Sequence, residues 1–154
     1  MKKKLLLGLL VVVLAGIQFI RPAKNLGPLE PGPGDIAVLF ATPPPIRTIL
    51  AKACYDCHSD RTRYPWYAEV QPVGWWLASH IKDGRRHLNF SQFASYPSKR
   101  ADHKLEAAIR EIRDEEMPLG SYTLIHRDAA LTDAESAALT AWLESVRRQL
   151  PTNP

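Results

Sequence analysis

The sequence predicts an all-α fold, because apolar residues recur at helical spacing in four segments and nowhere alternate as they do in a half-buried β-strand. Its 154 residues allow one modest domain and exclude the larger barrels and two-domain enzymes. The chain contains no internal repeat that would indicate a solenoid. We therefore expect a single small helical domain.

The chain begins with three lysines at 2–4, followed by an apolar run over 5–20 that Arg21 closes. A cleavable signal peptide is one interpretation, but the run exceeds the usual signal-peptide core and no small-x-small cleavage site follows it. It approaches the about 20 residues that span a bilayer. We predict an uncleaved anchor over 1–24 in a bacterial inner membrane, with the amino terminus cytoplasmic and the remainder in the periplasm.

Proline and glycine dominate the next segment, 25–44, which we predict to be a tether because such a sequence can bury little apolar surface. Within it, we expect Ile36, Val38, Leu39 and Phe40 to make the first contacts with the folded domain.

The charge pattern argues against a nucleic-acid partner. The chain has 20 Lys and Arg against 16 Asp and Glu, but five of the basic residues precede the first acid, Glu30. The remaining 15 basic residues nearly balance the acids, so the folded part has no basic surplus with which to bind phosphates.

The predicted domain over 45–150 contains four segments with an apolar stripe at helical spacing. Their ends carry helix signals. Pro72 begins the second segment and Gly84 follows its end, while Thr132 and Glu135 form a capping box at the start of the last. The predicted helices are 45–53, 72–82, 98–115 and 133–149.

Both cysteines lie in the sequence Cys54-Tyr-Asp-Cys57-His58, directly after the first predicted helix of the domain. The spacing Cys-x-x-Cys-His signals attachment of a c-type haem. Two thiols about one helical turn apart can each form a thioether with a haem vinyl group, and the imidazole of His58 can then bind the iron. We predict one covalently bound haem c.

Three other interpretations of this motif are weaker. A thioredoxin-type Cys-x-x-Cys normally follows a strand in a βαβ unit, which this sequence lacks. A structural zinc site needs four ligands, and no second cysteine pair or closely spaced histidine pair completes one. A disulfide is possible in an exported protein but does not explain the adjacent histidine.

Met117 is the predicted ligand on the other side of the iron, because a thioether suits haem iron and the neighbouring Pro118 helps to present it from a loop. The alternatives are a core methionine at this position and iron ligation by His80, which shares the apolar face of its helix. His87 is a weaker candidate on an exposed turn. We expect His103 and His126 at the surface.

Aromatic and arginine residues around the motif are candidates for the pocket, with ordinary packing and solvated surface as the alternatives. The aromatic residues would form the pocket wall and the arginines would pair with the haem propionates. The aromatic candidates are Tyr64, Trp66, Tyr67, Trp75 and Trp76; the arginines are Arg61, Arg63, Arg85 and Arg86.

Four stretches resemble a family of small, membrane-anchored bacterial haem-binding domains: 54–67, 89–91, 117–126 and 131–135. The resemblance covers roughly 36–148 and implies one c-type haem on Cys54 and Cys57, with His58 as axial ligand. More distantly, the order of helix, haem motif, methionine loop and final helix is similar to class I cytochromes c. The stretch 59–97 departs from that pattern, because it is richer in aromatics and arginines.

These features predict a membrane-tethered, periplasmic monohaem cytochrome that passes single electrons between redox partner proteins of the periplasm or inner membrane. We expect it not to be an enzyme, because the sequence lacks a catalytic triad pattern, a phosphate-binding loop and a carboxylate pair. Two alternatives remain open. One is a haem sensor or peroxidase-like protein with an open or exchangeable sixth ligand, and the other is a haem subunit of a larger membrane complex.

Overall fold

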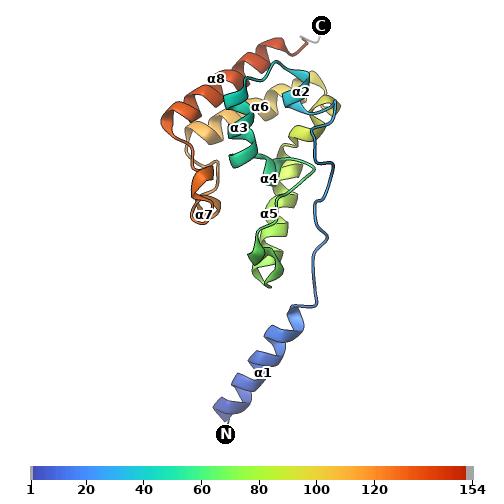
Figure 1. The fold of residues 1–154 in the computed structure, drawn as a ribbon, viewed down its shortest axis with the longest axis vertical. Coiled ribbons are helices and arrows are strands. Elements are labelled where there is room, and N and C mark those ends of the chain that lie inside the picture. The colour runs from blue at the N-terminus through green and yellow to red at the C-terminus, as the bar shows by residue number, and fades with distance from the viewer. Residues whose placement is uncertain (1, 152–154) are drawn as a thin grey trace.

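The computed structural model describes residues 2–151, which form helices and loops with no strand (Figure 1), so the all-α prediction is confirmed. Its α-helices are α1 (Lys2–Ile17), α2 (Ile36–Leu39), α3 (Pro44–Ala53), α4 (Tyr55–His58), α5 (Val73–His87), α6 (Ser98–Arg113), α7 (Gly120–Thr123) and α8 (Asp133–Gln149). Three 3₁₀ helices connect them: η1 (Trp66–Glu69), η2 (Phe90–Ser95) and η3 (Arg127–Ala129).

The main core lies where α6 and α8 pack side by side and α3 crosses them (Figure 1). Leu105 and Ile109 of α6 meet Leu139 and Leu143 of α8 in one buried cluster. The predicted apolar stripes of α6 and α8 therefore face this core. The capping box at Thr132 also forms, since its side chain accepts from the Glu135 N–H and the Glu135 carboxylate accepts from the Thr132 N–H.

The second predicted helix continues past Gly84 as α5 and ends at His87. Gly84 is not a stop signal here. A Cβ atom on Gly84 would lie 2.6 Å from the Cys57 carbonyl oxygen, so glycine permits α5 to pass directly against α4.

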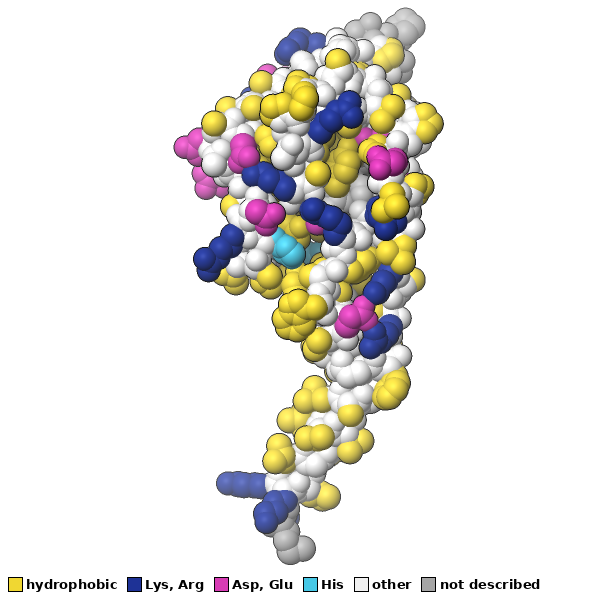
Figure 2. Space-filling view, in the orientation of Figure 1, with side chains coloured by type: hydrophobic (Ala, Val, Ile, Leu, Met, Phe, Trp, Pro, Cys, Tyr) yellow, Lys and Arg dark blue, Asp and Glu magenta, His cyan; other side chains and the backbone are white. Residues whose placement is uncertain are grey.

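Helix α1 projects away from the domain with apolar side chains around it (Figure 2), and none of its residues is buried. Its 16 residues rise about 24 Å, less than the ~30 Å hydrocarbon core of a bilayer. Among residues 2–151, no helix is both long enough and apolar enough to cross a membrane. The predicted anchor over 1–24 is therefore wrong, and so is the inner-membrane and periplasmic location that depended on it.

The segment expected as a tether packs against the domain at several points. The Asn25 N–H donates to the Tyr64 hydroxyl over 2.7 Å, and the Gly27 N–H donates to the Asp60 carbonyl over 2.8 Å. Further along, Asp35 and Ile36 are fully buried. This segment therefore lies against the residues that follow the cysteine motif.

Candidate haem site

A cavity of about 1020 Å³ opens between α4, α5, α6 and the loop before α7. Its volume is at the upper end of the ~300–1,000 Å³ typical of small-molecule and cofactor sites. Most of its wall is apolar, so it suits a large hydrophobic group. The apolar wall residues include Leu50, Leu88, Phe90, Ile112, Leu119, Leu131, Leu139 and Leu143.

Cys54 and Cys57 both border this cavity, and both are free thiols. Burial, with a contribution from the neighbouring Cys57, raises the pKa of Cys54 to about 12. Burial, assisted by Asp56, raises the pKa of Cys57 to about 11. Redox cysteines depend on the opposite shift, because the thiolate is the nucleophile. The part of the chain that the structure describes also contains no group of three or more residues able to hold a metal ion such as zinc.

His58 borders the cavity at the end of α4 with one ring nitrogen already engaged. Its Nδ1 lies 2.9 Å from the Leu88 carbonyl oxygen, which can only accept, so Nδ1 carries the proton. Burial lowers the pKa of His58, which favours the neutral ring. The lone pair on Nε2 is then available to a metal, in the arrangement that metal-binding histidines generally adopt.

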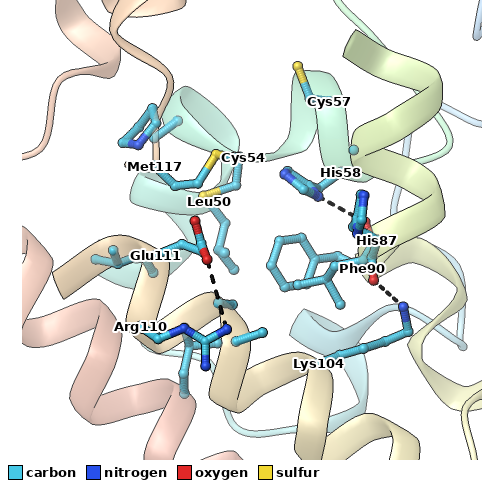
Figure 3. Close-up of a pocket in the computed structure, with 18 of the residues that line it drawn as sticks. Leu50, Cys54, Cys57, His58, His87, Phe90, Lys104, Arg110, Glu111 and Met117 are labelled. Atoms are coloured by element: carbon cyan, nitrogen blue, oxygen red, sulfur yellow. Dashed lines mark hydrogen bonds and ion pairs between the residues drawn. The ribbon is translucent and has the colours of Figure 1, made fainter. Parts of the chain in front are cut away.

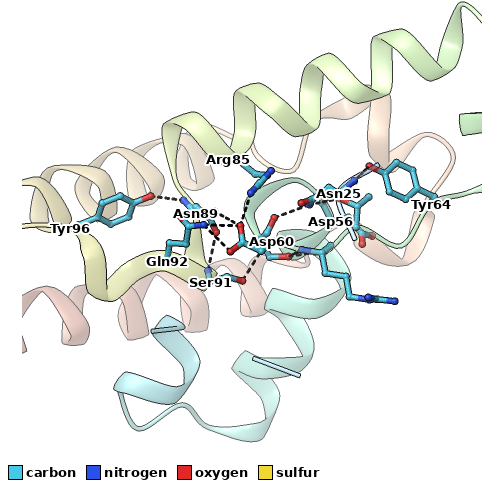
Figure 4. Close-up of polar contacts among 12 residues, drawn as sticks. Asn25, Asp56, Asp60, Tyr64, Arg85, Asn89, Ser91, Gln92 and Tyr96 are labelled. Atoms are coloured by element: carbon cyan, nitrogen blue, oxygen red, sulfur yellow. Dashed lines mark hydrogen bonds and ion pairs between the residues drawn. The ribbon is translucent and has the colours of Figure 1, made fainter. Parts of the chain in front are cut away.

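Asp60 fixes the segment that carries the Leu88 carbonyl (Figure 4). Its carboxylate accepts from Arg85 at 2.7 Å, Asn89 at 2.8 Å and Gln92 at 2.9 Å. Burial alone would raise the pKa of Asp60, but these hydrogen bonds outweigh it and lower the pKa. Because Leu88 lies between Arg85 and Asn89, the partner of His58 is held against α4.

Met117 faces His58 from the other side of the cavity (Figure 3). Its loop is attached to α4, because the Tyr122 hydroxyl donates to the Asp56 carboxylate over 2.8 Å. Tyr122 also stacks on His126, with ring centroids 4.4 Å apart. Arg63 contacts the same Asp56 carboxylate at 2.9 Å. Asp56 therefore joins the cysteine motif to the methionine loop.

Three further histidines border the cavity, and a fourth, His126, lies outside it. His80 borders it from α5, and its Nδ1 donates to the Trp76 carbonyl, which leaves Nε2 available. His87 and His103 also border it, although both side chains are exposed. His126 is half-buried and its Nε2 lies 2.7 Å from the Tyr67 hydroxyl, so the predicted surface position is corrected.

The predicted aromatic wall is wrong. Trp66 is 80% exposed and Trp76 is 44% exposed, and neither borders the cavity. Tyr67 instead packs with Leu77 and Ile81 in a second, smaller core. The cavity wall is instead largely aliphatic, with Phe90 and Tyr122 among the residues that border it. The sequence pattern could not reveal which helices meet there.

The predicted propionate partners are also corrected. The Arg61 guanidinium donates to the Gly27 carbonyl, Arg63 and Arg85 pair with Asp56 and Asp60, and Arg86 pairs with Asp83 in an exposed pair. None of these arginines borders the cavity. The lysines and arginines that do border it lie on α6: Lys99, Arg100, Lys104 and Arg110.

Sequence reasoning also missed Asp56, Asp60 and Tyr122 as parts of the site. For two of them, nearness in sequence to the proposed ligands could have suggested a role, since Asp56 lies between the cysteines and Tyr122 follows Met117. Their partners are far away in sequence and become visible only in the folded chain.

A family described as a haem-binding domain matches residues 12–145, most of the chain and every residue that borders the cavity. No curated protein and no solved structure matches the chain.

Proposed function

The chain belongs to the haem-binding domain family, and from that premise we propose that it is a monohaem c-type cytochrome that carries single electrons between redox proteins. One observation carries the proposal. Both cysteine thiols and the available Nε2 of His58 border a single apolar cavity, and Met117 lies beside Cys54, across the cavity from His58 (Figure 3).

The residues of the site have distinct roles in this proposal. Each thiol, of Cys54 and of Cys57, would add across one vinyl group, forming a sulfur–carbon bond while its hydrogen passes to the other vinyl carbon. That addition needs no oxidant. His58 Nε2 and the Met117 thioether would then hold the iron from its two faces.

Bound haem supplies one-electron redox chemistry, and the protein tunes it through the axial ligands and their hydrogen bonds. The Leu88 carbonyl orients His58 and makes it a stronger donor. A methionine on the other face favours a raised reduction potential. Because Met117 would occupy the sixth position, we propose a carrier rather than an enzyme.

The test begins with the full chain produced together with a haem c maturation system. We expect haem to stay with the chain after denaturation, and to be lost when Cys54→Ala and Cys57→Ala are combined. Small mediators should reduce and reoxidise the haem reversibly. Haem that acidic solvent extracts from the unaltered chain would contradict covalent attachment.

Carbon monoxide binding separates the carrier from its main rival. A filled sixth position predicts little or no binding of carbon monoxide to the reduced protein. Tight binding with the fold intact would favour a sensor or a peroxidase-like protein instead. Copurification with a larger complex under mild conditions would favour a subunit role.

A further inference from the structure

We propose that the first half of α6 binds the two haem propionates through Lys99, Arg100 and Lys104, which border the cavity. This inference rests on the proposed haem site and adds which end of the cavity receives the carboxylates. These residues take the role of propionate partner that the sequence analysis gave to arginines near the cysteine motif. Those arginines bind Gly27, Asp56 and Asp60 instead.

The chemistry of haem sets the orientation. The vinyl groups and the propionates project from opposite edges of the macrocycle. Attachment of the vinyl edge at Cys54 and Cys57 would therefore direct the propionates to the far end of the cavity. Lys104 lies at that far end, across the cavity from Cys57 (Figure 3).

One face of α6 forms this part of the wall. Its cavity-bordering residues recur every three or four positions, as residues on a single helix face do. Ala107 and Ala108 lie in the middle of this face, and their small side chains leave room for a flat ring edge. The cationic side chains follow toward the start of the helix at Lys104, Arg100 and Lys99.

These three cations lack carboxylate partners. Within residues 2–151, no salt bridge includes Lys99, Arg100 or Lys104, whereas Arg147 on the facing helix pairs with Asp102 at 2.7 Å. The Lys104 ammonium donates to the His87 carbonyl and lies 4.9 Å from the centre of the Tyr96 ring.

Like charges crowd this end of the cavity. The Arg100 guanidinium lies 5.6 Å from the same Tyr96 ring. Burial, with the charge of Arg100 adding to it, lowers the pKa of Lys104, which an anion placed beside it would reverse. Two carboxylates at this end would supply the missing counter-charges.

The other end of the α6 face is less suitable. Arg110 borders the cavity there, but the Glu111 carboxylate lies 3.9 Å from its guanidinium and also borders the cavity. A propionate at that end would meet a like charge beside its cation. The charge distribution therefore favours the end that holds Lys104.

The test compares ferric haem with its dimethyl ester, which has the same ring without the carboxylates. The full chain carrying Cys54→Ala and Cys57→Ala is titrated with each, so that binding is reversible. We expect the free acid to bind at least about tenfold more tightly than the ester, as charge-assisted hydrogen bonds imply. Adding Lys99→Gln, Arg100→Gln and Lys104→Gln should remove this preference and leave ester binding unchanged.

A matched control carries Lys82→Gln, Arg127→Gln and Arg148→Gln, which remove three exposed cations outside the cavity. It should keep the preference for the free acid. If the first triple variant fails to fold by circular dichroism, the single change Lys99→Gln gives the same comparison at an exposed position, with a smaller loss.

The outcomes separate the two proposals. Equal affinity of the chain for acid and ester would overturn the propionate site while leaving haem binding intact. A preference that survives in the α6 triple variant would overturn it as well. Failure of the chain to bind either form would instead contradict the haem site itself.

Discussion

At the scale of single residues, the geometry of the site depends on hydrogen bonds to its residues as much as on the Cys-x-x-Cys-His motif itself. The Leu88 carbonyl fixes the protonated nitrogen of His58, and Asp60 holds the segment that carries Leu88. Across the cavity, Tyr122 attaches the methionine loop to Asp56. These contacts place the two proposed iron ligands from elements far apart in the sequence.

Replacement of the proposed sixth ligand tests that placement. Met117→Ala should abolish the weak long-wavelength sulfur-to-iron band of the ferric protein and lower its reduction potential, because the thioether is lost. His80→Ala, on the same cavity, is the control and should leave both unchanged. If instead His80→Ala changed the spectrum and the reduction potential while Met117→Ala changed neither, His80 would be the sixth ligand.

The bond from Tyr122 to Asp56 is tested by Tyr122→Phe, which removes the hydroxyl and keeps the ring stacked on His126. We expect a loss of about 1 kcal/mol in the free energy of unfolding. The sulfur-to-iron band should also fade at a lower temperature than in the unaltered protein, because the loop is less firmly held.

Tyr64→Phe is the matched control, since that hydroxyl accepts a hydrogen bond from Asn25, outside the methionine loop. It should lower stability without changing the temperature at which the band fades. An equal effect of both changes on the band would contradict a positioning role for Tyr122.

At the scale of elements, the long helices could be predicted and the short ones could not. Helices α3, α6 and α8 match the predicted segments within a few residues, because each has an apolar stripe and α8 also begins with a capping box. Helices α4 and α7 have four residues each, too few to show a period. The residues that line the cavity depend on which helices pack together. The sequence therefore predicts the position of the cysteine motif but not the residues that surround it in the fold.

Helix contact itself can be tested at Gly84, where α5 passes against α4. Gly84→Ala would place a Cβ 2.6 Å from the Cys57 carbonyl, so the helices must separate. We expect destabilisation by about 1–3 kcal/mol and a lower yield of haem-loaded protein. The measurement is the urea midpoint, together with the ratio of haem to protein.

Gly120→Ala is the matched control, because a Cβ there meets nothing within 4 Å. It should leave stability and haem content nearly unchanged. Equal effects at the two glycines would show that the contact between α4 and α5 is not tight.

At the scale of the whole molecule, ion pairs join elements that are distant in sequence. Arg147 of α8 holds Asp102 of α6 at 2.7 Å, and Lys52 of α3 holds Glu135 of α8 at 2.7 Å. Hydrogen bonding to Arg147 lowers the pKa of Asp102, and hydrogen bonding to Lys52 lowers the pKa of Glu135. Carboxylates with a lowered pKa stabilise the fold above their ordinary pKa, and that contribution is lost as pH falls through the lowered value.

Acid should therefore weaken the contact between α6 and α8. Asp102→Asn should cost less than about 1 kcal/mol at pH 7, because the pair is partly exposed, and almost nothing at a pH below the lowered pKa, where the carboxylate is protonated. Urea midpoints at pH 7 and at the acid limit measure this difference. Asp114→Asn, an exposed carboxylate outside the ion pairs of residues 2–151, should show no such dependence on pH. The same cost for Asp102→Asn at both pH values would contradict the account.

We propose a covalent haem whose iron would be held by His58 and Met117 in the apolar cavity between α4, α5 and α6. Its most direct test is the absorption spectrum of the haem-loaded full chain in the ferric and ferrous states. We predict a low-spin spectrum, with the weak sulfur-to-iron band present in the ferric form. A low-spin spectrum without that band would replace Met117 by a histidine such as His80, and a high-spin spectrum would contradict a filled sixth position altogether.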